Sequence, residues 1–228
     1  MGVERETPLL DAAALGANFT NEGGAYGTVR LLKNVMGLWL LESCRKEWAD
    51  AGRSLDVDLL VSAIAAVSGF GGFVYPDAER FFNPSSMLAA LRATLDETKQ
   101  DAPEEPVLIA KVILDSLELR YASVVRTIES LTGRAVPGIH IVGGGSQNDY
   151  LNQATADAAD RPVLAGPAEA TAAGNLLVQA IASGDVASLA EGRELLSRAL
   201  TPRRFEPKNA APWAEAKRHY AEIEAAAG

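Results

Sequence analysis

The chain has few of the side chains that form metal sites and covalent catalytic centres. Among its 228 residues, Cys44 is the one cysteine, so an internal disulfide is impossible, as is usual for a protein of a reducing compartment. The two histidines, His140 and His219, lie far apart in the sequence, which argues against a zinc site made of Cys and His. We therefore expect neither a metal site nor an obvious nucleophile in this chain.

Positive charge and long apolar runs are also scarce. The chain has 21 Lys and Arg against 30 Asp and Glu, a formal net charge of −9, which disfavours non-specific binding to the phosphates of nucleic acid. No apolar run reaches the roughly 18 residues that a membrane-spanning helix requires. The start, "MGVERETPLL", lacks the apolar centre of a signal peptide. These features predict a cytoplasmic protein without membrane or nucleic-acid partners.

Apolar residues, in contrast, are abundant and regularly spaced. They make up 48% of the chain, enough for a substantial core. Spacings of three and four residues predict a long helix over 104–133, which Gly133 ends, and the run "IHIV" predicts a short strand with His140 in the core. Mostly helical segments with short strands between them indicate an α/β fold. We expect one domain over 1–228, with its core in about 1–205 and a tail helix in 206–228. The other expected helices are 34–50, one starting near Asp56, one capped by a serine in "SSMLAALRATLDETK", about 149–159, one ended by Gly184, 186–199 and 212–226.

The stretch "IHIVGGGSQNDYLNQ" has the strongest functional signal. An apolar strand meets three glycines and then a helix pattern, an arrangement that brings ligand phosphates or a nucleoside to the N–H groups of a helix N-terminus. A tight strand-to-helix turn without a ligand is the alternative. The lysine of a P-loop is absent, and Asn148 stands where the third glycine of a dinucleotide-binding GxGxxG would be. The ATPase fold of sugar kinases, actin and Hsp70 agrees better with the order of strand, glycines, helix and strand.

Three motifs in one order make this general pattern specific. "TNEGG", "LKNVMGLWLL" and "IVGGGSQN" resemble segments of the FGGY family of carbohydrate kinases, in particular its bacterial rhamnulokinases, and the similarity runs from Met1 to about Trp213. The resemblance implies the C-terminal, nucleotide-binding lobe of a ribonuclease H-like fold, helix-rich, with an incomplete sheet at its N-terminal end. The N-terminal lobe, which in the family carries the catalytic aspartate, is expected to lie outside this chain. We therefore expect no catalytic residue here. The chain could be a truncated or mis-started reading frame or an isolated domain.

The resemblance also implies which residues contact ligands. Asn34 matches an asparagine that contacts the sugar, although it could instead cap the helix expected over 34–50. Glu42 stands where the family usually has a glutamine near ATP, and a carboxylate there would repel phosphates unless a cation lies between them. Ser146 or Asn148 could be a plain helix cap. The residues expected to contact ATP are Gly143, Gly144, Gly145, Ser146, Gln147, Asn148 and Glu42.

The implied activity is transfer of a phosphoryl group from ATP, with Mg²⁺, to a ketose. L-rhamnulose, giving L-rhamnulose 1-phosphate, is the expected sugar, and this chain would supply the lobe that binds ATP. Two alternatives remain open. One is a related FGGY pentulose or hexulose kinase. The other is a non-catalytic nucleotide-binding or interaction fragment, which could self-associate through an exposed sheet edge.

Overall fold

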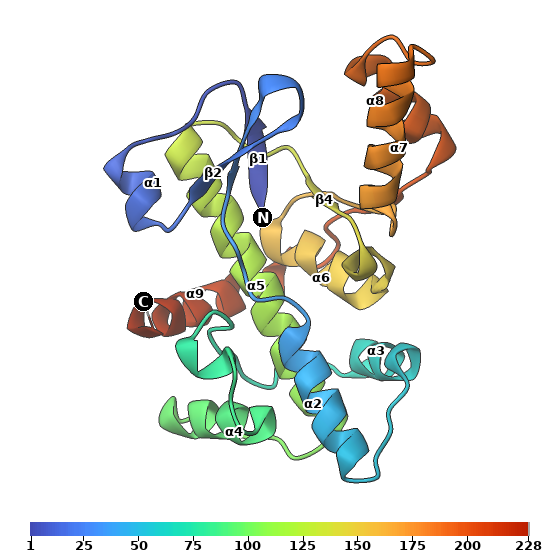
Figure 1. The fold of residues 1–228 in the computed structure, drawn as a ribbon. Coiled ribbons are helices and arrows are strands. Elements are labelled where there is room, and N and C mark those ends of the chain that lie inside the picture. Colours follow the sequence, from blue (N-terminus) through green and yellow to red (C-terminus); the bar gives the residue numbers. More distant parts are fainter. Residues whose placement is uncertain (228) are drawn as a thin grey trace.

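The computed structural model describes residues 1–227 and contains two small sheets packed among helices (Figure 1). The first sheet has the order β1-β3-β2, all antiparallel, and the second has the order β4-β5-β6. In the second sheet β4 and β5 are parallel, whereas β6 is antiparallel to β5. The strands are β1 (Gly2–Arg5), β2 (Thr20–Gly23), β3 (Val29–Leu32), β4 (Ile139–Ile141), β5 (Val163–Ala165) and β6 (Arg203–Phe205).

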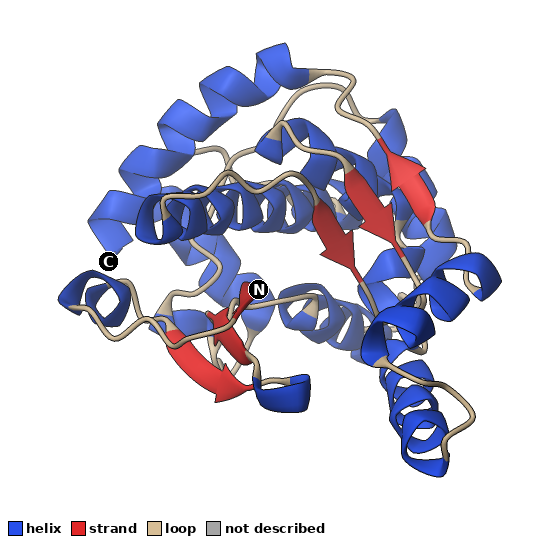
Figure 2. Cartoon of the chain, turned by 90° about the horizontal axis from the view of Figure 1, so that it is seen from above, coloured by secondary structure: helices blue, strands red, loops and turns tan. Residues whose placement is uncertain are grey.

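Helix α5 (Pro106–Thr132) passes through the middle of the molecule, as the spacing of its apolar residues predicts. Pro106 lies in its first turn, where a backbone N–H would have no acceptor within the helix. Gly133 ends the helix with φ +65°. Its central residues are buried on almost every side because helices and loops cover it all round. Figure 2 shows this helix running beside both groups of strands.

Where a side chain caps the first turn, the helix begins close to the position expected for it. Asp56 accepts from the Leu59 N–H and Ser86 from the Ala89 N–H, so both caps are confirmed. The helices are α1 (Ala12–Gly16), α2 (Trp39–Asp50), α3 (Val57–Ala66), α4 (Met87–Glu97), α6 (Asp149–Ala159), α7 (Ala170–Ser183), α8 (Leu189–Ala199) and α9 (Ala210–Ala227).

Helix α2 starts five residues later than expected, so the alternative role considered for Asn34, as the cap of this helix, is wrong. The segment 33–37 before α2 has no regular secondary structure, and the Met36 N–H donates to the Asp77 carboxylate at 2.6 Å. This long-range bond holds the chain out of the helical conformation. Helix α2 begins after Leu38, which makes no side-chain capping bond.

His140 is exposed, so the expected core position is also wrong. It belongs to β4, which is an edge strand among residues 1–227 because it pairs with β5 alone. The His140 Nε2 atom lies 2.5 Å from the Gly166 carbonyl oxygen. Ile139 and Ile141 are half-buried and point to the opposite face, so at β4 the sheet is better covered on their face than on the face of His140.

Cys44 belongs to the main apolar cluster, which α2, α3, α4 and α5 form together. It is fully buried, and this burial, together with Glu47, raises the pKa of the thiol to about 12. We expect iodoacetamide to alkylate Cys44 only through unfolding, because the reactive thiolate is absent in the folded chain. Mass spectrometry should show negligible labelling in buffer at pH 8 and complete labelling in denaturant. Rapid labelling of the folded chain would contradict this expectation.

No helix within residues 1–227 combines the length and the apolar character that crossing a membrane requires.

Candidate functional site

The glycine loop leaves β4 and turns sharply before α6. Gly143 has φ +77°, a conformation that favours glycine, and its N–H donates to the Pro167 carbonyl at 3.1 Å. Gly144–Gln147 then form one 3-10 turn. Asn148 closes the loop, because its side chain accepts from the Leu151 N–H at 2.9 Å and so caps α6. The capping role considered for Asn148 is therefore confirmed.

This loop borders a cavity of about 330 Å³, a size typical of small-molecule sites. The residue before α2, together with α2 and α3, contributes four aliphatic side chains but also two carboxylates and a serine. The glycine loop, the start of α6 and β6 contribute glycine and polar residues. The lining residues are Leu38, Leu41, Glu42, Val57, Asp58, Val61, Ser62, Gly144, Gln147, Asn148, Asp149 and Arg203. Aliphatic side chains beside polar groups are suited to a flat heterocycle with polar edges.

The predicted contact residues divide into two groups. Gly144, Gln147 and Asn148 line the cavity together with Glu42, although α2 precedes the loop by about a hundred residues. A Cβ atom on Gly144 would meet no atom within 4 Å, so the space beside this glycine is open. The structure thus brings four of the seven predicted ATP-contacting residues to one place.

Gly143, Gly145 and Ser146 shape the loop instead of lining the cavity. A Cβ atom on Gly145 would touch Ile141 and Leu151 at 3.7 Å, so this glycine faces the protein interior. Ser146 is buried, and its hydroxyl donates to the Gly143 carbonyl at 2.7 Å. These residues hold the turn in which Gly144 is presented to the cavity.

Two arginines, Arg203 in the cavity lining and Arg45 paired with the lining residue Glu42, were not anticipated from the sequence. Arg45 donates to both oxygens of Glu42, at 2.7 and 2.8 Å, so a cation does stand beside the carboxylate that was expected to repel phosphates. Arg203 pairs with Asp149 and donates to the Ser146 carbonyl at 2.7 Å. The position of Arg45, three residues after Glu42 on a helix, is a signal that the sequence does contain. No sequence signal points to Arg203.

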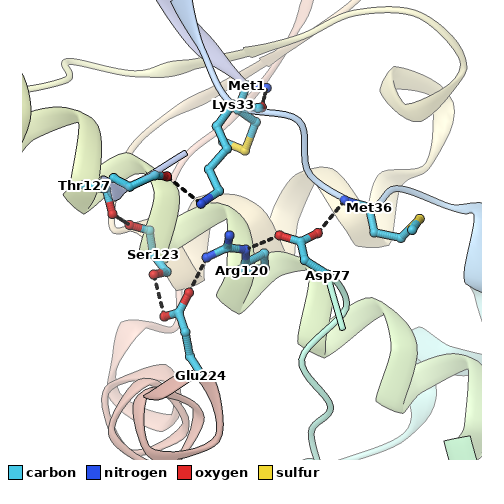
Figure 3. Close-up of polar contacts among 9 residues, drawn as sticks. Met1, Lys33, Met36, Asp77, Arg120, Ser123, Thr127 and Glu224 are labelled. Atoms are coloured by element: carbon cyan, nitrogen blue, oxygen red, sulfur yellow. Dashed lines mark hydrogen bonds and ion pairs between the residues drawn. The ribbon is translucent and has the colours of Figure 1, made fainter. Parts of the chain in front are cut away.

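Asn34 does not line this cavity. It is exposed in the irregular segment before α2, where flanking residues make long-range contacts. The Lys33 ammonium donates to the Ala17 carbonyl at 2.7 Å, and the Met36 N–H is held by Asp77. Asp77 in turn accepts from Arg120 of α5, and Figure 3 shows this chain of contacts continuing to Glu224 of α9. This network holds the backbone of the segment that contains Asn34.

A protein-bound metal ion has no evident place here. No three His, Cys, Asp or Glu side chains gather into a metal-binding group anywhere in the part of the chain that the structure covers. Of the cavity's carboxylates, Glu42 and Asp149 are already paired with arginines. The donor set therefore does not fit a metal ion held by this chain alone.

Sequence comparison connects this arrangement with known proteins. Residues 1–183 match the model of the "FGGY family of carbohydrate kinases, C-terminal domain". A rhamnulokinase of Bacteroides thetaiotaomicron is 41% identical over 220 residues, which is 96% of this chain and 44% of the relative. A rhamnulokinase of Pectobacterium carotovorum is 44% identical over 209 residues, which is 91% of this chain and 41% of the relative. The chain thus spans less than half the length of these curated relatives.

Structural comparison agrees at the level of the fold. A gluconate kinase from Lactobacillus acidophilus superposes with a TM-score of 0.68 at 13% identity, covering 99% of this chain and 44% of the neighbour. A xylulose kinase from Rhodospirillum rubrum gives 0.64 at 18% identity, with coverage of 99% and 44%. The expected helix-rich, ribonuclease H-like lobe is confirmed. Fold, motifs and family match together show that the chain belongs to the FGGY family of carbohydrate kinases, as a C-terminal domain.

Proposed function

We propose that this chain is the ATP-binding lobe of a kinase that phosphorylates L-rhamnulose to L-rhamnulose 1-phosphate. The observation that carries the proposal is the single cavity that Gly144, Gln147, Asn148 and Glu42 share. The named relatives, both rhamnulokinases, support the choice of sugar. A cytoplasmic location would suit such an enzyme.

In this proposal the aliphatic lining residues take the adenine ring, with Leu41 and Val61 in contact with its faces. The loop side places Gln147 and the backbone at Gly144 against the polar edge of the base and the ribose. Helix α6 begins at the same place, so the positive end of its dipole favours the negative phosphates. Bound ATP would supply the phosphoryl group, and Mg²⁺ would enter with the phosphates.

The sugar would bind outside this cavity, and the catalytic base would not be one of the residues that line it. Asn34 is proposed to reach the sugar from its fixed segment. The base that deprotonates the sugar hydroxyl is proposed to come from the rest of the kinase polypeptide, with catalysis resting on positioning and charge stabilisation. The chain alone should therefore bind ATP weakly and transfer nothing. Rhamnulose phosphorylation by the isolated chain would contradict this.

Replacement of Gly144 tests the nucleotide site directly. Gly144→Val should leave the fold intact, because its Cβ meets no protein atom, yet it should fill the space beside the loop. We expect the affinity for MgATP, measured by isothermal titration calorimetry, to fall about tenfold or more, which corresponds to about 1.4 kcal/mol.

Gly174→Val on α7 is the matched control, since a Cβ there also meets no atom within 4 Å and Gly174 lies outside the cavity. It should bind MgATP as the unmodified chain does. Equal affinities of the Gly144→Val chain and the unmodified chain would exclude this cavity as the nucleotide site.

A further inference from the structure

Strand β6 places one arginine at the cavity beside the glycine loop. Arg203 and Phe205 lie on the same face of this strand, because alternate residues of a strand point the same way. The Arg203 guanidinium lies over the Phe205 ring, 5.6 Å from the ring centroid. Arg203 lines the cavity and Phe205 does not. The guanidinium thus has an aromatic ring as one neighbour and the open cavity as another.

Two acceptors on the loop side hold this guanidinium. One terminal nitrogen of Arg203 pairs with the Asp149 carboxylate, and the other donates to the Ser146 carbonyl at 2.7 Å. Two contacts at different nitrogens fix the orientation of a planar group, and the Asp149 carboxylate compensates its charge. The Arg203 side chain is nevertheless 49% exposed, so a ligand in the cavity can reach it.

The rest of the cavity lining leaves room for such a contact. Leu41 and Val61 offer aliphatic surface to a flat ring, and among residues 1–227 no aromatic side chain lines the cavity. Arg203 is the one cation in that lining within the described part of the chain. A guanidinium is planar and weakly hydrated and stacks on π-systems, which makes it a suitable partner for a heterocycle.

We propose that the Arg203 guanidinium stacks on the base of the bound nucleotide, over the part of the ring that Leu41 and Val61 leave uncovered. Asp149 and Ser146 keep the guanidinium plane in place for this contact. Because Asp149 already compensates the positive charge, Arg203 acts on the base and contributes little to binding the phosphates. This inference rests on the proposed ATP site and adds a binding residue to it.

Titrations with adenosine and with MgATP test the proposal, because adenosine carries the base without the phosphates. Arg203→Ala should weaken the binding of both ligands by the same factor, about fivefold, the size of a cation–π contact at a partly exposed site. Chemical-shift changes in NMR spectra measure the weak affinity for adenosine, and isothermal titration calorimetry measures that for MgATP.

Arg204→Ala is the matched control. It removes the same charge from the next residue of β6, but Arg204 pairs with Glu206 and lies outside the cavity lining. It should bind both ligands as the unmodified chain does. Circular dichroism would verify that both alanine variants fold.

Arg203→Lys separates the plane of the side chain from its charge. Lysine keeps a cation beside Asp149 but lacks the planar group, so most of the loss of adenosine affinity should remain. A direct signature accompanies it in the unmodified chain. The Arg203 Hε resonance, identified by its absence from the Arg203→Lys spectrum, should move upfield when adenosine is added, because it enters the ring current of the base. Magnesium tripolyphosphate, which has no base, should not move it.

Three outcomes would overturn the stacking role and leave the nucleotide site standing. In the first, Arg203→Ala weakens MgATP binding but not adenosine binding, which would assign Arg203 to the phosphates. In the second, Arg203→Lys binds adenosine normally, so that charge alone suffices. In the third, Arg203→Ala binds both ligands normally while Gly144→Val loses MgATP. An unmodified chain that binds neither ligand would instead overturn the proposed function, and this inference with it.

Discussion

Arg120→Met is expected to lower the free energy of unfolding by about 3 kcal/mol, the lower end of the cost of removing one partner of a buried ion pair, because the two carboxylates are only partly buried. Arg120 lies on α5 with 5% of its side chain exposed, and it donates to Asp77 at 2.7 Å and pairs with Glu224. Methionine retains most of the apolar stem and removes the charge. Urea denaturation monitored by circular dichroism measures the change.

The size of this effect follows from what Arg120 connects. Asp77 lies in the loop before α4, and Glu224 lies on α9, so one guanidinium joins three segments far apart in the sequence (Figure 3). Glu224 also accepts from the Ser123 hydroxyl at 2.6 Å. Burial lowers the pKa of Arg120 and the two carboxylates raise it, with a net rise, so the cation is retained in the fold.

Arg80→Met is the matched control. Arg80 pairs with Glu97 at 2.8 Å, but both side chains are well exposed, so its loss should change stability by no more than about 0.5 kcal/mol. Adding Asp77→Asn and Glu224→Gln to Arg120→Met should recover part of the lost stability, because neutral amides need no cation. A loss below about 1 kcal/mol in Arg120→Met would show that the network contributes little.

Glu118→Gln is expected to remove a strong pH dependence of stability. Glu118 is fully buried in α5, and neither of its carboxylate oxygens has a hydrogen-bond partner in the structure. Burial raises the pKa of Glu118 well above its usual value, and the neighbouring carboxylate of Asp115 adds to the rise, which Lys111 opposes. The folded chain therefore binds this proton at pH values where the unfolded chain has released it.

The linkage between proton binding and folding determines whether stability rises or falls with pH. Between the unfolded pKa near 4.5 and the higher folded pKa, the native state holds more protons than the unfolded state, so stability falls as pH rises. The expected slope is about 1.4 kcal/mol for each pH unit while one proton separates the two states. Burial raises the pKa of Asp115 as well, which adds to the slope in the same direction.

Urea denaturation at several pH values from 5 to 8 would measure this slope in the unmodified chain and in Glu118→Gln. The variant should be flatter, by up to about 1.4 kcal/mol per pH unit in the part of this range that lies below the folded pKa of Glu118. We compare slopes and not absolute free energies of unfolding, because a buried glutamine amide without hydrogen-bond partners destabilises the fold by an amount that does not depend on pH. Glu222→Gln, an exposed replacement on α9, should leave the slope unchanged. Parallel slopes in the chain and in Glu118→Gln would mean that Glu118 titrates normally.

The sequence alone determined the local features of this protein. Helix α5 and its end at Gly133, the caps at Asp56 and Ser86, and the glycine turn after β4 depend on residues within a few positions of one another. Such features follow from periodicity, capping and backbone freedom, which a sequence displays directly. The family motifs are local in the same sense. For this reason the fold class and the family could be predicted.

Tertiary structure alone decided which distant groups meet. It starts α2 at Trp39, because Asp77 binds the Met36 N–H across 41 positions of sequence. It leaves His140 exposed, since its face of the sheet is less covered than that of Ile139 and Ile141, and it brings Glu42 to the same cavity as Gly144. The physical reason is common to all three. Each depends on how separate elements pack and which faces of a sheet are covered, and no spacing within one segment encodes that.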